Sequence, residues 1–426
     1  MEQMKRCELC RGIYLNSVKD DRFKSGRISV NLSVPIAKET VAQNALLIQL
    51  LGRCCKAYPD YISLNREVSR LYGAVIGTDC VKLGDLQTLT LSVSGLDDRY
   101  TLNGEVLSEE LANLLCKMLF EPKLEGEAFA SDDVEQERRQ LLELIEAEAN
   151  DKRRYAVKQC IGMMCQNDPF GISRVGTYDQ VCSVTPQDVY RAWKNVLETA
   201  VVNVVVVGRL DDEAIGEAFK AEFLKLERNA VECGITPYEF DGELKQLVET
   251  QEVMQSKLVM GFSCKISAGD ERADHAKLMT LVLGGTPSSK LFTNVREKES
   301  LCYYCAANYN RQKGIILVDS GVEKQNIEKA KKEILNQLEQ IKQGNITDFE
   351  ISAAKLAVGD SAGMVTDSVS GIEKFYSSQL FEKEILSPEQ AAQRINAVTK
   401  EQIVEAANCV ELAAVYVLTD GKEGEE

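Results

Sequence analysis

The stretch SVTPQDVYRAWKNVLETAVVNVVVVG, residues 183–208, is the part of the sequence that decides the fold. A threonine followed by a proline is typical of a helix N-cap and first helical position, and the apolar residues after them recur at helical spacing. The β-branched run before Gly208 predicts a strand, and its nearly continuous apolar character is typical of a central strand in a covered sheet. The stretch therefore predicts a short helix followed by a buried strand.

The same pattern returns near the end of the chain, in AVTKEQIVEAANCVELAAVYVLTDG at residues 397–421. The two halves also begin alike, because GRISVNLSVPI at 26–36 is answered by SKLVMGFSCKI at 256–266. Each of these is an alternating strand followed by a polar turn and a helix. A further helix, a hairpin and long amphipathic helices follow in both halves. Repetition of the whole order of elements indicates two copies of one structural unit.

The repeat predicts an α+β fold with two tandem homologous domains, each a mostly antiparallel β-sheet with helices packed on it. We expect the first domain at residues 1–228 and the second at 248–426. The linker is expected at 229–247, inside a turn-containing stretch without periodicity.

Composition limits the classes of partner. A chain of 426 residues, 44% hydrophobic and 27% charged, is long enough for two domains with proper cores. The formal net charge of -16 argues against nucleic acid or an anionic membrane surface as a partner, whereas a basic peptide would be attracted. No signal peptide is recognised and the apolar runs are too short to span a bilayer, so we expect a cytoplasmic protein without a membrane span.

The 14 cysteines are spread along the chain without dense spacing, which favours reduced thiols used as small buried hydrophobes. Two C-x-x-C pairs, Cys7 with Cys10 and Cys302 with Cys305, have together the four thiolates that one zinc requires. Residues i and i+3 of a strand point to opposite faces, which argues against joint chelation by the second pair. A structural zinc site or redox chemistry at these two pairs remains as an alternative to buried, reduced thiols.

The stretch GGTPSSKLFTNVREKESLCYY, residues 284–304, carries polar residues beyond a helix start. Thr286 is expected to cap the helix, with Pro287 at its first position. Arg296 then lies at the edge of the apolar stripe, and strand alternation predicts that Tyr303 is half-buried. Taken by themselves, such residues usually serve solvation and packing.

The repeated layout, with this stretch early in the second half, resembles the pitrilysin/insulinase-type (inverzincin) metallopeptidase family, which includes the mitochondrial processing peptidase subunits. The resemblance covers essentially the whole chain. It implies the mitochondrial-processing-peptidase/LuxS-like metallohydrolase fold, in which two subunits or two fused halves close around a chamber that holds an unfolded peptide.

Active members of that family carry an HxxEH motif on the first helix of the first domain and a further glutamate on a later helix. Two imidazoles and a distant carboxylate hold the zinc, and the motif's glutamate activates the bound water. The resemblance places Ala45 and Gln49 at the histidine positions, Ile48 at the glutamate position, and Leu144 at the distal ligand, with Glu143 one residue away. These positions form a degenerate zinc motif, and no metal is expected in this chain.

The histidine content leads to the same conclusion without any alignment. The chain contains one histidine, His275, so a site with two histidine ligands cannot be built. His275 lies in DERADHAKLMT, a predicted helix start, where a solvated polar position is the expected role. The resemblance therefore places the catalytic zinc in a partner subunit.

In pitrilysin-like enzymes an arginine and a tyrosine of the half without zinc help to hold the substrate carbonyl and its developing oxyanion. The matching residues here are Arg296 and Tyr303, a cation and a phenol donor suited to that task. The resemblance thus implies an inactive bacterial subunit that lacks the zinc motif. It would pair with a zinc-bearing homologue, or with itself, and supply Arg296 and Tyr303 in trans to a basic or unfolded peptide.

Two hypotheses of other classes remain open. The chain is a pure scaffold or peptide-binding protein without a peptidase partner, or it is an independent enzyme that uses its cysteines. An adjacent gene for an HxxEH homologue would favour the paired subunit over the scaffold, and metal analysis of the purified protein tests the cysteine enzyme.

Overall fold

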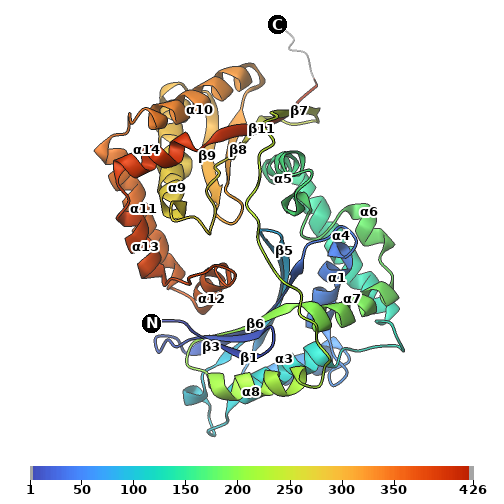
Figure 1. Cartoon of the computed structure of the whole chain (residues 1–426). Coiled ribbons are helices and arrows are strands. Elements are labelled where there is room, and N and C mark those ends of the chain that lie inside the picture. The colour runs from blue at the N-terminus through green and yellow to red at the C-terminus, as the bar shows by residue number, and fades with distance from the viewer. Residues whose placement is uncertain (1–2, 422–426) are drawn as a thin grey trace. The chain divides into compact units, whose positions relative to one another are not determined.

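The computed structural model describes residues 3–421, which form two β-sheets with helices packed on them (Figure 1). In spatial order, the first sheet contains β1 (Lys5–Cys10), β2 (Ile13–Val18), β6 (Val201–Val207), β3 (Ser25–Pro35), β5 (Leu86–Leu96) and β4 (Val75–Leu83). The second contains β7 (Lys245–Thr250), β11 (Glu411–Thr419), β8 (Ser256–Ser263), β10 (Ile315–Val322) and β9 (Cys302–Asn310). The predicted α+β class is confirmed.

The two sheets have the same connectivity. Strand β2 runs parallel to β6, and β7 runs parallel to β11, whereas every other neighbouring pair is antiparallel. With β1 set aside, each strand of the first sheet has a counterpart at the same place in the second. The predicted repeat is therefore confirmed by strand order and direction.

The helices follow the same plan in both halves. The first half contains α1 (Val41–Arg53), α2 (Tyr61–Arg70), α3 (Leu107–Phe120), α4 (Ser131–Asn150), α5 (Lys152–Met164), α6 (Tyr178–Ser183), α7 (Pro186–Thr199) and α8 (Asp212–Phe223). The second contains α9 (Ala273–Thr280), the wide turns η3 (Leu281–Gly285) and η4 (Leu291–Lys298), α10 (Ile327–Lys342), α11 (Asp348–Val365), α12 (Val369–Ser377), α13 (Pro388–Asn396) and α14 (Lys400–Asn408). No helix formed by residues 3–421 is long and apolar enough to cross a membrane.

The two threonines that open the repeated stretch cap their helices as predicted. Thr185 accepts a hydrogen bond from the backbone N–H of Asp188, and Thr399 accepts one from Gln402, each completing a capping box. The strands that follow, β6 and β11, are central in their sheets. Each repeat therefore contains the same capped helix followed by an interior strand.

The chain forms two compact units that are discontinuous in sequence. The first unit contains Met1–Ile145, Ile172–Gly234 and Met364–Ser387, and the second contains Glu146–Gly171, Ile235–Gly363 and Pro388–Glu426. Helix α5 of the first repeat packs on β8 and β11 of the second sheet, and α12 of the second repeat packs on β6 and β3 of the first. The bounds 1–228 and 248–426 stay a prediction for the repeat, and each compact unit includes one helix from the other repeat. Strand β7 begins at Lys245, inside the stretch expected as linker.

Strand β3 illustrates the two faces of the first sheet. Ile28, Val30 and Leu32 belong to the apolar core beneath the unit's own helices. The alternate residues of the strand are polar, and the opposite face of the sheet therefore carries hydroxyl, amide and guanidinium groups. Helix α12 packs on this second face, where Ile372 and Tyr376 contact the apolar end formed by Val205 and Val207.

Buried charges hold α5 to the second unit. Lys313 is fully buried, and its ammonium lies 2.9 Å from a carboxylate oxygen of Asp168, just beyond the end of α5. Near the start of the helix, Arg153 forms an ion pair with Asp319 of β10. Because a buried charge is costly unless it is paired, these contacts fix the segment that carries α5.

Asp168→Asn should destabilise the second unit by about 3 kcal/mol, because it removes a charge that faces a buried ammonium. Hydrogen exchange measured along residues 152–164 should accelerate in this variant, and the double variant Asp168→Asn with Lys313→Met should recover much of the protection. Arg154→Gln is the matched control, because Arg154 makes an exposed ion pair and its loss should cost less than about 1 kcal/mol. Unchanged exchange in Asp168→Asn would contradict this account of how α5 is held.

Candidate functional site

The three positions expected to carry a degenerate zinc motif lie on α1, and two of them are part of the hydrophobic core. Ala45 is 1% exposed and Ile48 is 0% exposed, and both pack in the apolar cluster of the first unit. Gln49 is half-buried, and its side-chain oxygen accepts a hydrogen bond of 2.8 Å from the Thr78 hydroxyl of β4. These three residues are thus used for packing and for one hydrogen bond.

Helix α1 also approaches the edge strand β4 closely at Gly52, one turn after Gln49. A Cβ at Gly52 would clash with the methyl group of Thr78. Gly52 and Gln49 therefore contact the same residue, the first through the absence of a side chain and the second through its amide. Close packing and one hydrogen bond therefore hold α1 against the sheet edge.

The predicted distal position lies on α4. Leu144 is 41% exposed, and the neighbouring Glu143 is also exposed. The carboxylates of α4 that contact α1 lie earlier in the helix, where Asp133 and Glu137 each lie 3.0 Å from the guanidinium of Arg53. An arginine thus holds the two helices together through carboxylates that the sequence interpretation did not single out.

The donor set at these positions does not fit zinc. The resemblance would require two imidazoles and a general base at these positions, but the side chains present are a methyl group, a sec-butyl group and an amide, whereas zinc prefers thiolate, imidazole and carboxylate ligands. Within residues 3–421 there is no group of three or more histidine, cysteine, aspartate and glutamate side chains that could hold a metal ion. His275 lies half-buried on α9 in the second unit, rather than on a fully solvated face.

Arg296 lies on η4 in the second unit. Leu291 and Val295 bury one side of this turn, and Arg296 remains exposed with its guanidinium 4.4 Å from the centre of the Phe292 ring. A buried ion pair between Lys290 and Glu350, with an N–O distance of 3.0 Å, anchors the start of the turn to α11. The backbone that carries Arg296 is therefore held in place, while its side chain is exposed.

The helix that carries Arg296 begins later than predicted. Thr286 accepts a hydrogen bond of 3.3 Å from the backbone N–H of Ser288, so it caps a turn that precedes the helix. Helical structure begins around Lys290, and the prediction that Pro287 occupies the first helical position is wrong. The Thr-Pro signal was local, and the turn that it specifies ends before the helix begins.

Tyr303 is the extra residue of a β-bulge. In the pairing of β9 with β10, Cys302 is opposite Val322 and Tyr304 is opposite Gly321, so Tyr303 has no opposite residue. The bulge turns its side chain outward, and Tyr303 is 62% exposed instead of half-buried as predicted. Its hydroxyl donates a hydrogen bond of 3.3 Å to a carboxylate oxygen of Glu323.

The bulge also corrects the prediction for the neighbouring cysteines. Cys302 and Cys305 both join the core of the second unit, because the extra residue cancels the alternation that would send them to opposite faces. A hydrogen bond from the Cys305 thiol lowers the pKa of Cys302 to about 7, and the same bond raises the pKa of Cys305 well above its usual value. The cysteines are free thiols in the structure, so this pair is a buried dithiol.

Comparisons with known proteins agree with this geometry. Residues 183–358 match the family model described as Peptidase M16 inactive domain. The chain is 30% identical over 420 residues to Probable inactive metalloprotease YmfF of Bacillus subtilis strain 168, and the match covers 97% of each chain. It is 24% identical over 240 residues to Uncharacterized zinc protease YmxG of the same strain, which covers 56% of this chain and 58% of the relative.

A solved structure matches the whole chain. The crystal structure of a conserved protein from Enterococcus faecalis V583 has a TM-score of 0.92 and 25% sequence identity, and the match covers 100% of both chains. The complete arrangement of elements is thus shared with an experimentally determined protein.

Ile48→Glu should lower the free energy of unfolding by at least about 3 kcal/mol, because it buries a carboxylate in an apolar core without a partner. Gln49→His is the matched control on the same helix and should cost less than about 1.5 kcal/mol, because the site is half-buried and already polar. Urea denaturation of the two variants checks the contrast. The triple variant Ala45→His, Ile48→Glu and Gln49→His should bind no stoichiometric zinc, and stoichiometric zinc in a folded triple variant would contradict the core assignment.

The Cys302 thiol should titrate with a midpoint of about 7, because Cys305 donates a hydrogen bond to its thiolate. In Cys305→Ala the donor is lost, and the midpoint should rise toward or above the ordinary cysteine value of about 8.5. Carbon-13 chemical shifts of labelled cysteine, followed against pH, measure both values. A wild-type midpoint above about 8.5 would show that the proposed hydrogen bond does not stabilise the thiolate.

Proposed function

Because this chain belongs to the peptidase M16 family, we propose that it is the zinc-less subunit of a two-chain peptidase. A homologous subunit with an intact HxxEH motif would supply the zinc and the general base. This chain would supply peptide-binding surface together with Arg296 and Tyr303. Pairing of the chain with itself would give a protein that binds peptides without hydrolysing them.

One contrast carries the proposal. The motif positions Ala45 and Ile48 have become core, whereas the complete fold is retained and Arg296 and Tyr303 remain exposed. The resemblance assigns an exposed cation and phenol at these positions to the substrate carbonyl, so their presence here supports a role in peptide chemistry. The similarity to both an inactive metalloprotease and a zinc protease of one Bacillus subtilis strain supports the existence of paired zinc-less and zinc-bearing homologues.

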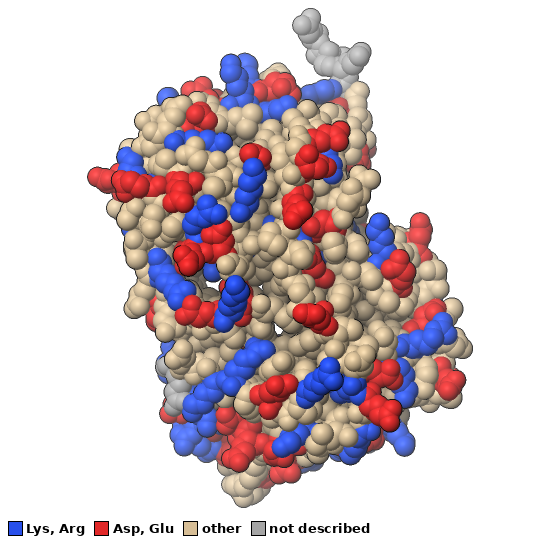
Figure 2. Space-filling view, viewed as in Figure 1, with Lys and Arg blue, Asp and Glu red and all other residues tan. Residues whose placement is uncertain are grey.

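Charge favours a basic peptide as the ligand. The net charge of -16 attracts cations at long range, and this attraction weakens as salt increases. On the face shown in Figure 2, acidic and basic side chains are interspersed without a broad area of one sign. The preference is therefore expected to be general for basic or unfolded peptides. Free cysteines are consistent with the proposed cytoplasmic location, where thiols remain reduced.

The hydrogen bond between Tyr303 and Glu323 must break before the phenol can bind a substrate. The phenol already donates to an exposed carboxylate, and it can donate to a developing oxyanion only after it leaves this acceptor. Arg296 needs no such release, because its guanidinium rests on the Phe292 ring and its N–H groups remain available to a carbonyl oxygen.

The same contact favours the scaffold hypothesis as the second candidate. If Glu323 keeps the Tyr303 hydroxyl in the assembled protein, the phenol serves local structure and the chain binds peptides without contributing to turnover. The two candidates differ in what happens when the hydroxyl alone is removed.

Tyr303→Phe should lower turnover by the assembled pair roughly a hundredfold, because one oxyanion donor is lost. Arg296→Ala should weaken peptide binding as well, because a charged donor is lost. The experiment reconstitutes this chain with a zinc-bearing homologue and measures kcat and peptide affinity. Glu323→Gln should leave turnover within about threefold or increase it, because it weakens the competing acceptor.

Tyr61→Phe is the matched control for these variants. Tyr61 is 75% exposed in the first unit, and loss of its hydroxyl should change neither turnover nor affinity. Unchanged turnover in both Tyr303→Phe and Arg296→Ala, with assembly intact, would favour the scaffold.

A further inference from the structure

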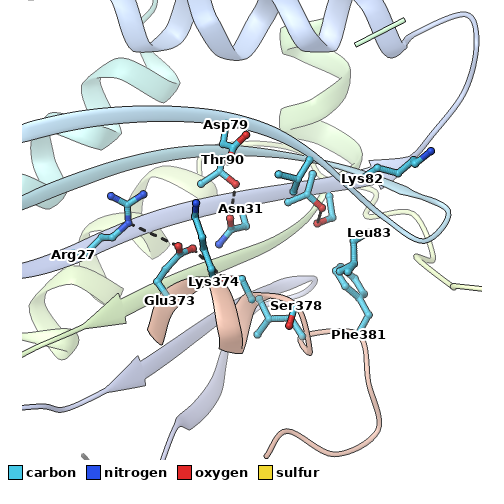
Figure 3. Close-up of a pocket in the computed structure, with 15 residues that line it drawn as sticks. Arg27, Asn31, Asp79, Lys82, Leu83, Thr90, Glu373, Lys374, Ser378 and Phe381 are labelled. Atoms are coloured by element: carbon cyan, nitrogen blue, oxygen red, sulfur yellow. Dashed lines mark hydrogen bonds and ion pairs between the residues drawn. The ribbon is translucent and has the colours of Figure 1, made fainter. Parts of the chain in front are cut away.

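A cavity of about 310 Å³ lies within the first unit, between α12 and the second face of the first sheet (Figure 3). Its lining comes from β3, β4 and β5 and from residues 373–381. It lies on the sheet face opposite the core that contains Ala45 and Ile48. Small-molecule sites measure about 300–1,000 Å³, so this volume suits a small ligand.

The floor of the cavity is polar and internally satisfied. Asn31 of β3 accepts a hydrogen bond of 2.7 Å from the Thr90 hydroxyl of β5, and the hydroxyls of Ser33 and Thr88 lie 2.9 Å apart. All four residues are buried. The hydroxyl oxygens of these pairs can still accept a further hydrogen bond, so the floor can bind a ligand N–H group without attracting either sign of charge.

The two charged groups at one end of the floor neutralise each other. Glu373 of α12 accepts hydrogen bonds from Ser29 at 2.9 Å and Ser377 at 3.0 Å. Arg27 donates to the hydroxyls of Ser92 and Ser94, and its Nε lies 3.8 Å from Glu373. Because this pair is engaged within the protein, it adds little net charge to the cavity.

The rim includes Asp79 and two lysines, Lys82 and Lys374. Asp79 on β4 and Lys374 on α12 are both exposed, and within the described part of the chain neither forms an ion pair or a side-chain hydrogen bond. In Figure 3 the Lys374 side chain extends from the helix toward the strands, and Asp79 lies on the strand side. The nearby Lys82 ammonium donates to the Ile172 carbonyl at 3.0 Å. Asp79 and Lys374 are therefore the rim charges available to a ligand.

The remaining wall is apolar. Val81 and Leu83 of β4 face Leu380 and Phe381, which follow α12. Figure 3 shows Leu83 and Phe381 close together at the end of the cavity away from Arg27. An apolar side chain placed there would be removed from water, at a gain of about 25 cal/mol per Å² of buried surface.

We propose that this cavity binds a short zwitterionic peptide of two or three residues with an apolar side chain. The ligand's ammonium would pair with Asp79, its carboxylate with Lys374, and its side chain would contact the wall of Leu83 and Phe381. Its amide groups would hydrogen bond to the polar floor. A ligand with one charge satisfies only half of the rim, whereas a zwitterion satisfies both charges at once.

This proposal does not depend on a peptidase partner. The cavity lies in the first unit, whereas Arg296 and Tyr303 lie in the second. Binding is measured on the isolated full chain, so its failure would leave the paired-subunit proposal untouched, and success would not establish that proposal.

The test is titration calorimetry of the full chain with leucyl-leucine, its N-acetyl form and its C-terminal amide. Leucyl-leucine should bind, and removal of either ligand charge should weaken binding about fivefold. In Asp79→Asn, N-acetylation should cause no further loss, and in Lys374→Gln, amidation should cause none, because each variant removes the partner of that charge. Asp360→Asn and Lys329→Gln are matched controls at exposed positions in the second unit and should behave like wild type.

Three outcomes would overturn the proposal. The first is no binding of leucyl-leucine at millimolar concentration. The second is binding that Asp79→Asn and Lys374→Gln leave unchanged. The third is a result in which replacing the rim residue abolishes the effect of only one of the two ligand charges. That result would exclude a zwitterion as the ligand. Both substitutions are at exposed positions, so the variants should fold like the wild type.

Discussion

The packing of α1 against the first sheet is the constraint on which the account depends. Ala45 and Ile48 lie in the core, and Gly52 lets the helix approach Thr78 at the edge strand. Imidazole and carboxylate ligands at these positions would need space and a polar environment that the core does not provide. The contacts of α1 are therefore apolar packing and one hydrogen bond, which do not suit the ligands that the resemblance places at these positions.

In the second unit, one inserted residue determines which neighbouring side chains lie in the core and which side chain is exposed. The bulge at Tyr303 sends the phenol to solvent and both Cys302 and Cys305 into the core. Without it, regular alternation would send one of the two thiols to the opposite face of the sheet. A bulge thus separates a chemically useful surface group from two thiols whose pKa values are shifted in opposite directions by their mutual hydrogen bond.

Local signals made much of the fold predictable from sequence. The helix caps at Thr185 and Thr399 form within one helical turn, and the apolar runs of β6 and β11 mark buried strands before their distant partners are known. The sequence did not predict that α5 packs on the second sheet and α12 on the first. This depends on which sheet each helix contacts in the folded protein, and no local signal specifies it. Strands β1 and β7 were missed because they are exposed edge strands without an apolar alternation. The cavity was not predictable from sequence because its walls come from β3 and α12, and the hydrogen bond between Ser29 and Glu373 that joins these elements spans 344 residues.

The central claim is that this chain contributes to peptide processing only as the zinc-less member of a pair. The most direct measurement is native mass spectrometry of the protein isolated from its own cell, combined with zinc analysis of the same sample. The account predicts an equimolar complex with a homologue that carries HxxEH, and one zinc per complex. A monomer or homodimer with stoichiometric zinc, or a sample without any such homologue, would contradict it.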